Sequence, residues 1–88
     1  MDVVISEHAR FEMVRRQISG EMVRNVVQHP QQTVELGKKR TICQSKYYDM
    51  VEDKEMLLRV IREERYDTIY IITAYKTSKI DKYWNKGS

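Results

Sequence analysis

The side chains with the most versatile chemistry in this sequence are a histidine near its start and an arginine in its second half. His8 can accept or donate a proton, because histidine side chains titrate near pH ~6.5. Arg59 stands among apolar neighbours in the run 57–61, where a partly desolvated guanidinium is well placed to bind a phosphate or carboxylate. Tyr75 could stack on a nucleobase or transfer a proton through its hydroxyl. These three are the candidate catalytic residues.

Four more side chains are candidate phosphate-binding residues: Arg16, Arg40, Thr73 and Lys76. Residues 31–50 and residues 67–88 each carry two more basic than acidic side chains, which accounts for the excess of positive charge in the chain. Such patches can bind phosphate, although a basic patch is more often plain solvated surface.

Each candidate catalytic residue also has a purely structural interpretation. His8 could be an interfacial histidine bonded to Glu12, which is one helical turn further on. Arg59 could form a cross-strand ion pair with an acidic neighbour, and Tyr75 could serve only to pack the sheet. The sequence leaves both interpretations open.

Two short helices are expected to position the first of these residues. Ser6 is a good N-cap for a helix that runs to about Gln17, and His8 falls at the border between its apolar stripe and solvent. Ser19 caps a second helix that ends before Pro30, since the residue before a proline avoids the helical conformation. The predicted apolar stripes are Phe11, Val14 and Ile18 in the first helix, and Met22, Val23, Val26 and Val27 in the second.

Short β-type runs separated by turns follow. They cover residues 33–36, 40–48, 55–62 and 68–75, and residues 80–84 are an edge strand or a docked tail. In the third run, Met56, Leu58 and Val60 should face the helices, and Leu57, Arg59 and Ile61 the other side. The close spacing favours antiparallel pairing. We therefore predict one α+β domain over residues 1–88, with two N-terminal helices packed on one face of a roughly four-stranded antiparallel sheet.

Several classes of protein are not expected. Cys43 is the only cysteine, so no intramolecular disulfide or thiolate metal cluster is expected, and a reducing cytoplasmic location is the default. No apolar run approaches the ~20 residues that cross a bilayer. No phosphate-binding glycine loop or metal-binding histidine motif is present. We expect no metal, no cofactor and no membrane association.

Four short motifs resemble a family of small prokaryotic proteins whose domain has no known function. They are Ser6-Glu7-His8-Ala9-Arg10, Arg15-Arg16-Gln17-Ile18-Ser19, Leu58-Arg59-Val60 and Ile72-Thr73-Ala74-Tyr75, and the resemblance spans roughly residues 5–76. His8, Arg16, Arg59, Thr73 and Tyr75 occupy motif positions, whereas Arg40 and Lys76 are candidates from charge and strand alternation. That family is similar in turn to the RelE, ParE and BrnT toxins.

This resemblance implies helices on one face of an antiparallel sheet, with metal-independent mRNA cleavage by basic and aromatic side chains on the open face. It also implies RNA as the substrate and a small antitoxin as a protein partner. The expected function is thus a toxin-like endoribonuclease. The rival hypothesis is a non-catalytic module that binds a protein partner, of which an inhibitor of the ParE type is one version.

Overall fold

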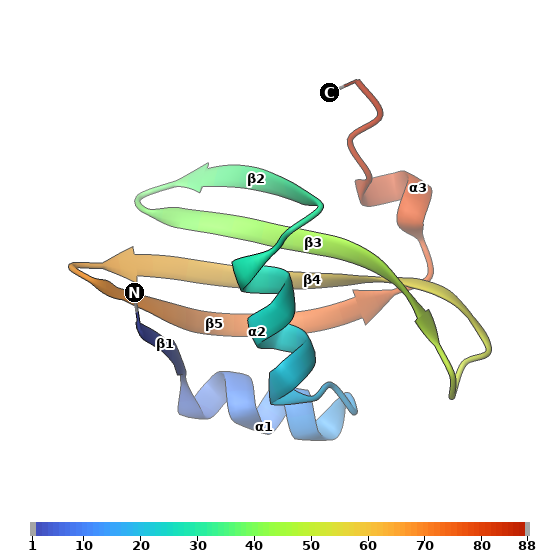
Figure 1. Ribbon diagram of the computed structural model, residues 1–88, viewed down its shortest axis with the longest axis horizontal. Coiled ribbons are helices and arrows are strands. Elements are labelled where there is room, and N and C mark those ends of the chain that lie inside the picture. Colours follow the sequence, from blue (N-terminus) through green and yellow to red (C-terminus); the bar gives the residue numbers. More distant parts are fainter. Residues whose placement is uncertain (1, 88) are drawn as a thin grey trace.

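The computed structural model describes residues 2–87, which form a mixed sheet with three helices (Figure 1). The elements in chain order are β1 (Asp2–Ile5), α1 (Glu7–Arg15), α2 (Gly20–Gln28), β2 (Gln32–Gly37), β3 (Arg40–Asp49), β4 (Lys54–Arg65), β5 (Thr68–Thr77) and α3 (Ile80–Tyr83). The α+β class is confirmed. No helix within residues 2–87 is long and apolar enough to cross a bilayer.

The sheet has five strands in the order β1-β5-β4-β3-β2. Strands β2 to β5 form the predicted antiparallel series, but β1 adds a fifth strand that pairs with β5 in parallel, from Asp2 opposite Thr68 to Ile5 opposite Ile71. The prediction of four antiparallel strands was therefore wrong in this detail. A four-residue strand whose partner lies in the last quarter of the chain leaves no local signal in the sequence.

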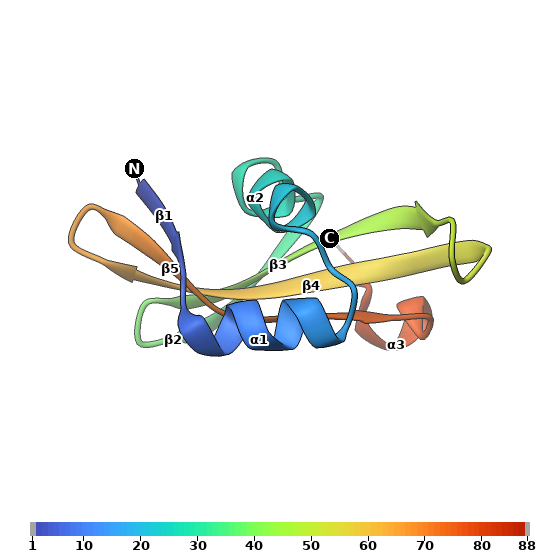
Figure 2. The same cartoon turned by 90° about the horizontal axis from the view of Figure 1, so that it is seen from below.

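The two N-terminal helices do not share a face of the sheet. Helix α2 crosses one face, whereas α1 runs alongside the edge of β5, where β1 has left it (Figures 1 and 2). The backbone N–H of Ser6 donates to the carbonyl oxygen of Ile71 at 3.2 Å, and Arg16 Nη1 donates to that of Ala74 at 2.8 Å. Ser6 and Arg16, at the two ends of α1, therefore donate hydrogen bonds to backbone carbonyl groups along this edge of β5.

The helix caps follow the sequence, but the buried side of α1 does not. The Ser6 and Ser19 hydroxyls accept hydrogen bonds from the backbone N–H groups three residues on, each at 3.1 Å. The predicted stripe is wrong for Phe11 and Val14, which are 65% and 80% exposed, and right for Ile18, which is buried in the core. Ala9 and Met13 are buried instead. Contact with a strand edge selects the small Ala9, which lets the helix backbone come close to β5.

The core lies between α2, the inner side of α1 and one face of the sheet. It contains the predicted α2 residues Val23, Val26 and Val27, and from the sheet Cys43, Leu58, Val60, Ile71 and Ala74. The alternation predicted for β4 is confirmed, since Leu58 and Val60 contact this core while Arg59 points to the other face. The free thiol of Cys43 belongs to the core, and its burial raises its pKa.

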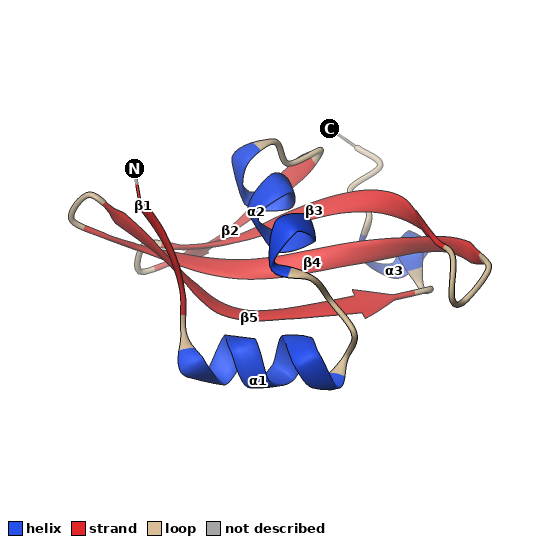
Figure 3. Cartoon of the chain, turned by 60° about the horizontal axis from the view of Figure 1, so that its bottom comes forward, coloured by secondary structure: helices blue, strands red, loops and turns tan. Residues whose placement is uncertain are grey.

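The opposite face is partly covered by α3. Residues 80–84 form a short helix followed by an extended residue, not an edge strand, and this helix lies across the sheet from α2 (Figures 2 and 3). We call the side of the sheet that carries Gln44, Arg59 and Tyr75 the Arg59 face, and residues 79–87 the C-terminal segment.

Candidate functional site

Arg59 is the most unusual side chain in the structure, because it is a buried cation held by neutral groups. Its residue is 7% exposed. Nε donates to Oε1 of Gln44 at 2.8 Å, and Nη1 donates to the Tyr75 hydroxyl at 2.6 Å. The guanidinium carbon also lies 4.3 Å from the centre of the Tyr83 ring. These four residues, from β3, β4, β5 and α3, form the Arg59 cluster.

The charge of Arg59 has no counter-ion within residues 2–87. No carboxylate lies within ion-pair distance of it, whereas six other basic side chains of the described chain have such partners. The Nη2 group of Arg59 donates no hydrogen bond to a described residue. Among residues 2–87, Nε of Arg62 is the only side-chain nitrogen or oxygen atom that is both fully buried and without a partner. Nη2 of Arg59 is therefore accessible from outside the cluster. One end of the guanidinium therefore keeps donors that an anion can use.

The C-terminal segment rests on the cluster through a few polar and ring contacts. The Tyr83 carbonyl oxygen accepts from Nε2 of Gln44 at 3.2 Å, and the Tyr83 ring meets the Tyr75 ring edge-on. Lys46 Nζ lies 4.1 Å from the centre of the Trp84 ring. Two hydrogen bonds, at 2.7 and 3.0 Å, join the Gln32 amide to the backbone of Asn85. No residue of α3 is buried, so this cover should open more easily than the sheet beneath it.

Four of the predicted site residues, Arg59 included, lie on the Arg59 face. Tyr75 pairs with Arg59 across β4 and β5, and Thr73 lies two residues away, opposite Ile61. Arg40 lies on the same side of β3 but at the far end of the face, where its Nε donates to Glu63 at 2.8 Å. The structure thus brings Arg59 and Tyr75 into contact and leaves Arg40 at a distance.

Arg16 and Lys76 have structural partners elsewhere. Arg16 bridges Ala74, as described above, and Glu12, whose Oε2 lies 2.8 Å from its Nη2. Lys76 lies on the α2 side of the sheet, where its Nζ is 3.1 Å from Oδ2 of Asp49. Neither side chain points to the Arg59 cluster.

His8 is exposed on α1 and makes no hydrogen bond through its side chain to a described residue. The hydrogen bond from Arg15 is the main cause of the lowered pKa of Glu12, and Arg16 and His8 contribute less. At ~100° per residue, His8 and Glu12 share one flank of α1, while Met13 packs into the core on the α2 side. His8 therefore borders the Arg59 face from the edge of the sheet, without touching the cluster.

Asp49 organises the turn between β3 and β4. Its Oδ1 accepts from the backbone N–H groups of Val51 and Glu52 at 2.9 and 3.0 Å, and its Oδ2 from the Tyr47 hydroxyl and from Lys76 at 3.0 and 3.1 Å. These bonds, that of Glu52 first and then that of Lys76, lower the pKa of Asp49 from 3.8 to about 2. The charged carboxylate is thus the form that stabilises the fold.

This pKa predicts a defined loss of stability in acid. A carboxyl with a lowered folded-state pKa stabilises the protein above its unfolded pKa of 3.8, and this contribution is lost as the pH falls to about 2. We expect Asp49→Asn to lower the Tm at pH 7 by roughly 5 °C and to make the Tm less sensitive to pH between 3.8 and 2. Thermal unfolding followed by circular dichroism measures both. An acid transition in the variant as steep as in the wild type would contradict the assignment.

The sequence did not reveal two members of the Arg59 cluster. Gln44, which is fully buried, could have been found as the polar residue in the run Ile42-Cys43-Gln44. Tyr83 had no such signal, because its contact with Arg59 depends on where the C-terminal segment docks. Within residues 2–87, no three His, Cys, Asp or Glu side chains are grouped so that they could hold a metal ion.

Comparison with known proteins gave one match. Residues 5–76 match the family model described as "Domain of unknown function (DUF4258)". The match ends one residue after Tyr75, so the C-terminal segment that covers the cluster lies beyond it. No curated protein and no solved structure matched the chain.

Proposed function

The chain belongs to the DUF4258 family, whose description names no activity, and we propose from the geometry that its Arg59 face binds single-stranded RNA and cleaves it without a metal ion. One observation carries this proposal: the Arg59 guanidinium is buried among neutral partners, and no carboxylate of residues 2–87 neutralises it. A buried charge without a counter-ion is costly for folding. An arginine kept in this way suits a site that receives an anion.

The surroundings of Arg59 favour a nucleic acid over a free anion. The Tyr75 ring lies beside the guanidinium, and the Tyr83 and Trp84 rings of the covering segment occupy places beside Arg59 and Lys46 that unpaired bases would take once the segment moves. Aromatic rings next to cations are how proteins bind unpaired bases together with the phosphates that join them. The C-terminal segment would have to move aside for a strand to reach the cluster.

Cleavage at this site needs only proton transfers and charge stabilisation. A base removes the 2′-hydroxyl proton, O2′ attacks the phosphorus, and the P–O5′ bond breaks as O5′ takes up a proton. The products are a 2′,3′-cyclic phosphate and a 5′-hydroxyl. Arg59 would stabilise the extra negative charge on the phosphorane oxygens. Tyr75 would donate the proton to O5′. His8, which does not touch the cluster, would act as the base when the bound strand brings its 2′-hydroxyl within hydrogen-bond reach of the imidazole.

The same function is implied by the resemblance to the RelE, ParE and BrnT toxins. A toxin of that kind needs a partner that keeps it inactive in the cell that makes it, so a cognate antitoxin is part of this proposal. An adjacent reading frame encoding a short acidic protein would support it.

The cleavage step is tested by replacing each of the two histidines. We expect the purified protein to cut RNA in the presence of EDTA and to leave 2′,3′-cyclic phosphate ends. His8→Ala should slow cleavage roughly 100-fold, because general-base catalysis typically contributes at least that much. His29→Ala is the matched control, since His29 is exposed at the end of α2, on the other side of the sheet. Equal activity of the two variants would remove His8 from the mechanism.

A protein-binding function has one observation in its favour. Phe11 and Val14 form an exposed apolar pair on the outer side of α1, where no described residue covers them. Exposed apolar groups of this kind can mark a surface for another protein. Capture of a stoichiometric protein partner, with RNA left intact and unbound, would favour this function over the nuclease.

A further inference from the structure

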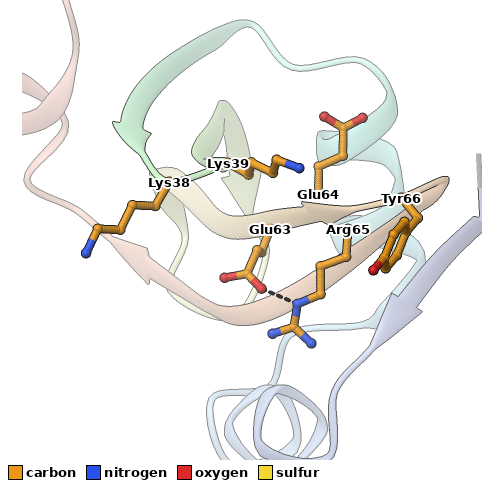
Figure 4. Close-up of a pocket in the computed structure, with 6 residues that line it drawn as sticks. All are labelled: Lys38, Lys39, Glu63, Glu64, Arg65 and Tyr66. Carbon is orange, nitrogen blue, oxygen red and sulfur yellow. Dashed lines mark hydrogen bonds and ion pairs between the residues drawn. The ribbon is translucent and has the colours of Figure 1, made fainter.

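A second cationic site lies at the end of the sheet where the β2–β3 and β4–β5 turns meet (Figure 4). We call it the hairpin-end hollow. It has a volume of about 640 Å³, and its lining residues are Lys38, Lys39, Glu63, Glu64, Arg65 and Tyr66. The backbone N–H of Glu64 donates to the carbonyl oxygen of Lys39 at 3.0 Å, which holds the two turns together.

Positive charge dominates this hollow. Including Arg40 at its edge, four cationic side chains face two carboxylates. Glu63 is already shared between Arg40 and Arg65, which hold its pKa below the usual range. Lys38 and Lys39 have no carboxylate partner within residues 2–87. Their ammonium groups are therefore available to an added anion.

Residues with side chains stand in both turns at positions whose positive φ angles glycine or asparagine would adopt more easily. Lys38, Lys39 and Tyr66 have φ angles of 52°, 65° and 55°, in the left-handed region that favours glycine or asparagine. Tight hairpin turns of this kind usually carry Asn-Gly or Asp-Gly. Two lysines and a tyrosine at such positions suggest that their side chains serve a purpose other than folding.

Tyr66 supplies the aromatic partner for these cations. It is 96% exposed, so its ring packs against nothing in the described chain. A tyrosine fully in water next to cationic side chains presents a ring on which an unpaired base can stack, while the cations contact phosphate oxygens.

The Arg59 face connects this hollow to the Arg59 cluster. Arg59 and Glu63 are four residues apart on β4, or roughly 13 Å. Ile61 and Thr73 lie between them and carry no charge that would repel a nucleic acid. At the far end Arg65 lies over the Tyr70 ring, at 4.9 Å from its centre, which repeats the pairing of a cation with a ring seen at Arg59.

We propose that the hairpin-end hollow is a second binding site for the same RNA strand, with its cationic side chains in contact with phosphates and an unpaired base stacked on Tyr66. This inference rests on the proposed function of the Arg59 face. It adds that the substrate is an extended single strand several nucleotides long, because a shorter one cannot reach both sites.

The test compares a dinucleotide with a longer unstructured oligoribonucleotide, both 2′-O-methylated so that no cleavage can occur. Binding is measured with the full chain and with the variant Lys39→Ala/Tyr66→Ser. Affinity for the longer strand should fall about tenfold or more, since stacking of one base contributes that much. In a plot of the logarithm of the binding constant against the logarithm of the salt concentration, the magnitude of the slope should fall by about 0.7 for the lost phosphate contact. Dinucleotide binding, seated at Arg59, should not change.

Two controls make the outcomes separable. Lys54→Ala removes an exposed lysine at the opposite end of the sheet, and Tyr66→Phe keeps the ring, so both should bind the longer strand like the wild type. Unchanged affinity of the double variant for the longer strand, or an equal loss with Lys54→Ala, would overturn the second site. In that case, if substitution of Arg59 abolished binding of both the dinucleotide and the longer strand, the proposed function of the Arg59 face would still be supported. A wild-type chain that binds neither probe would refute both proposals.

Discussion

Replacing Arg59 with methionine should weaken RNA binding by between about 10-fold and 100-fold, the range expected when a hydrogen-bonded charge is removed. Cleavage should fall further, by roughly 100-fold or more, because Arg59 would stabilise charge that develops only in the transition state. Fluorescence anisotropy with a labelled RNA measures the first effect, and single-turnover cleavage the second. Arg59→Lys should recover only part of the affinity, since a lysine cannot occupy both the Gln44 and Tyr75 contacts in the same plane.

Stability separates this loss from simple unfolding. Methionine fills a similar volume and removes a buried charge that has no counter-ion, and this gain offsets the two lost hydrogen bonds. We therefore expect the Tm of Arg59→Met to lie no more than about 5 °C below that of the wild type. Arg24→Met is the matched control, because Arg24 is exposed on α2, across the sheet from Arg59. RNA affinity that falls equally in the two variants would show an effect of net charge alone.

Removal of residues 79–88 should raise the affinity for RNA at least about tenfold. Tyr83 rests on Arg59 and Trp84 rests on Lys46, so the segment occupies the places that bases would take. If the segment leaves the cluster uncovered in ~10% of molecules or fewer, deletion of the segment raises the RNA affinity in inverse proportion to that fraction. The deletion begins after the last residue of β5 and leaves the family-matched part of the chain whole.

The full-length chain provides an independent check on this deletion. Gln32→Ala removes both hydrogen bonds to Asn85 without shortening the chain, and it also removes the bond that Gln32 accepts from Gln44 at 2.9 Å. Because Gln44 keeps its bond to Arg59, the variant should raise RNA affinity, but by less than the deletion does. Hydrogen exchange should show faster exchange in α3 than in β4 in the wild type, because no residue of α3 is buried. Lower RNA affinity of the deleted chain would instead assign Tyr83 and Trp84 to the binding surface itself.

Local chemistry in the sequence was sufficient to predict most of the individual elements. Ser6 and Ser19 are helix caps because their hydroxyls satisfy N–H groups three residues away, an interaction that needs no tertiary contact. The alternation in β4 likewise placed Arg59 away from the helices. Each of these inferences depends on residues that are close in the sequence.

Inferences that needed long-range contacts were the ones that failed or were missing. The outward position of Phe11 and Val14 follows from α1 lying on a strand edge, which helical periodicity cannot predict. The strand β1 was not predicted because it forms by pairing with β5, which lies more than sixty residues away along the chain. The sequence showed that Arg16, Arg40 and Lys76 are charged, but it could not predict the groups that they contact.

The sequence by itself determined the periodicity of the strands, the caps of the helices and the presence of an arginine between apolar neighbours. Only the tertiary structure decided that this arginine contacts Gln44, Tyr75 and Tyr83, and that no carboxylate of the described chain lies within ion-pair distance of it. The physical reason is range. Backbone preferences and side-chain periodicity act over a few residues, whereas the electrostatic surroundings of Arg59 are assembled from three strands and a C-terminal helix that come together only in the folded chain.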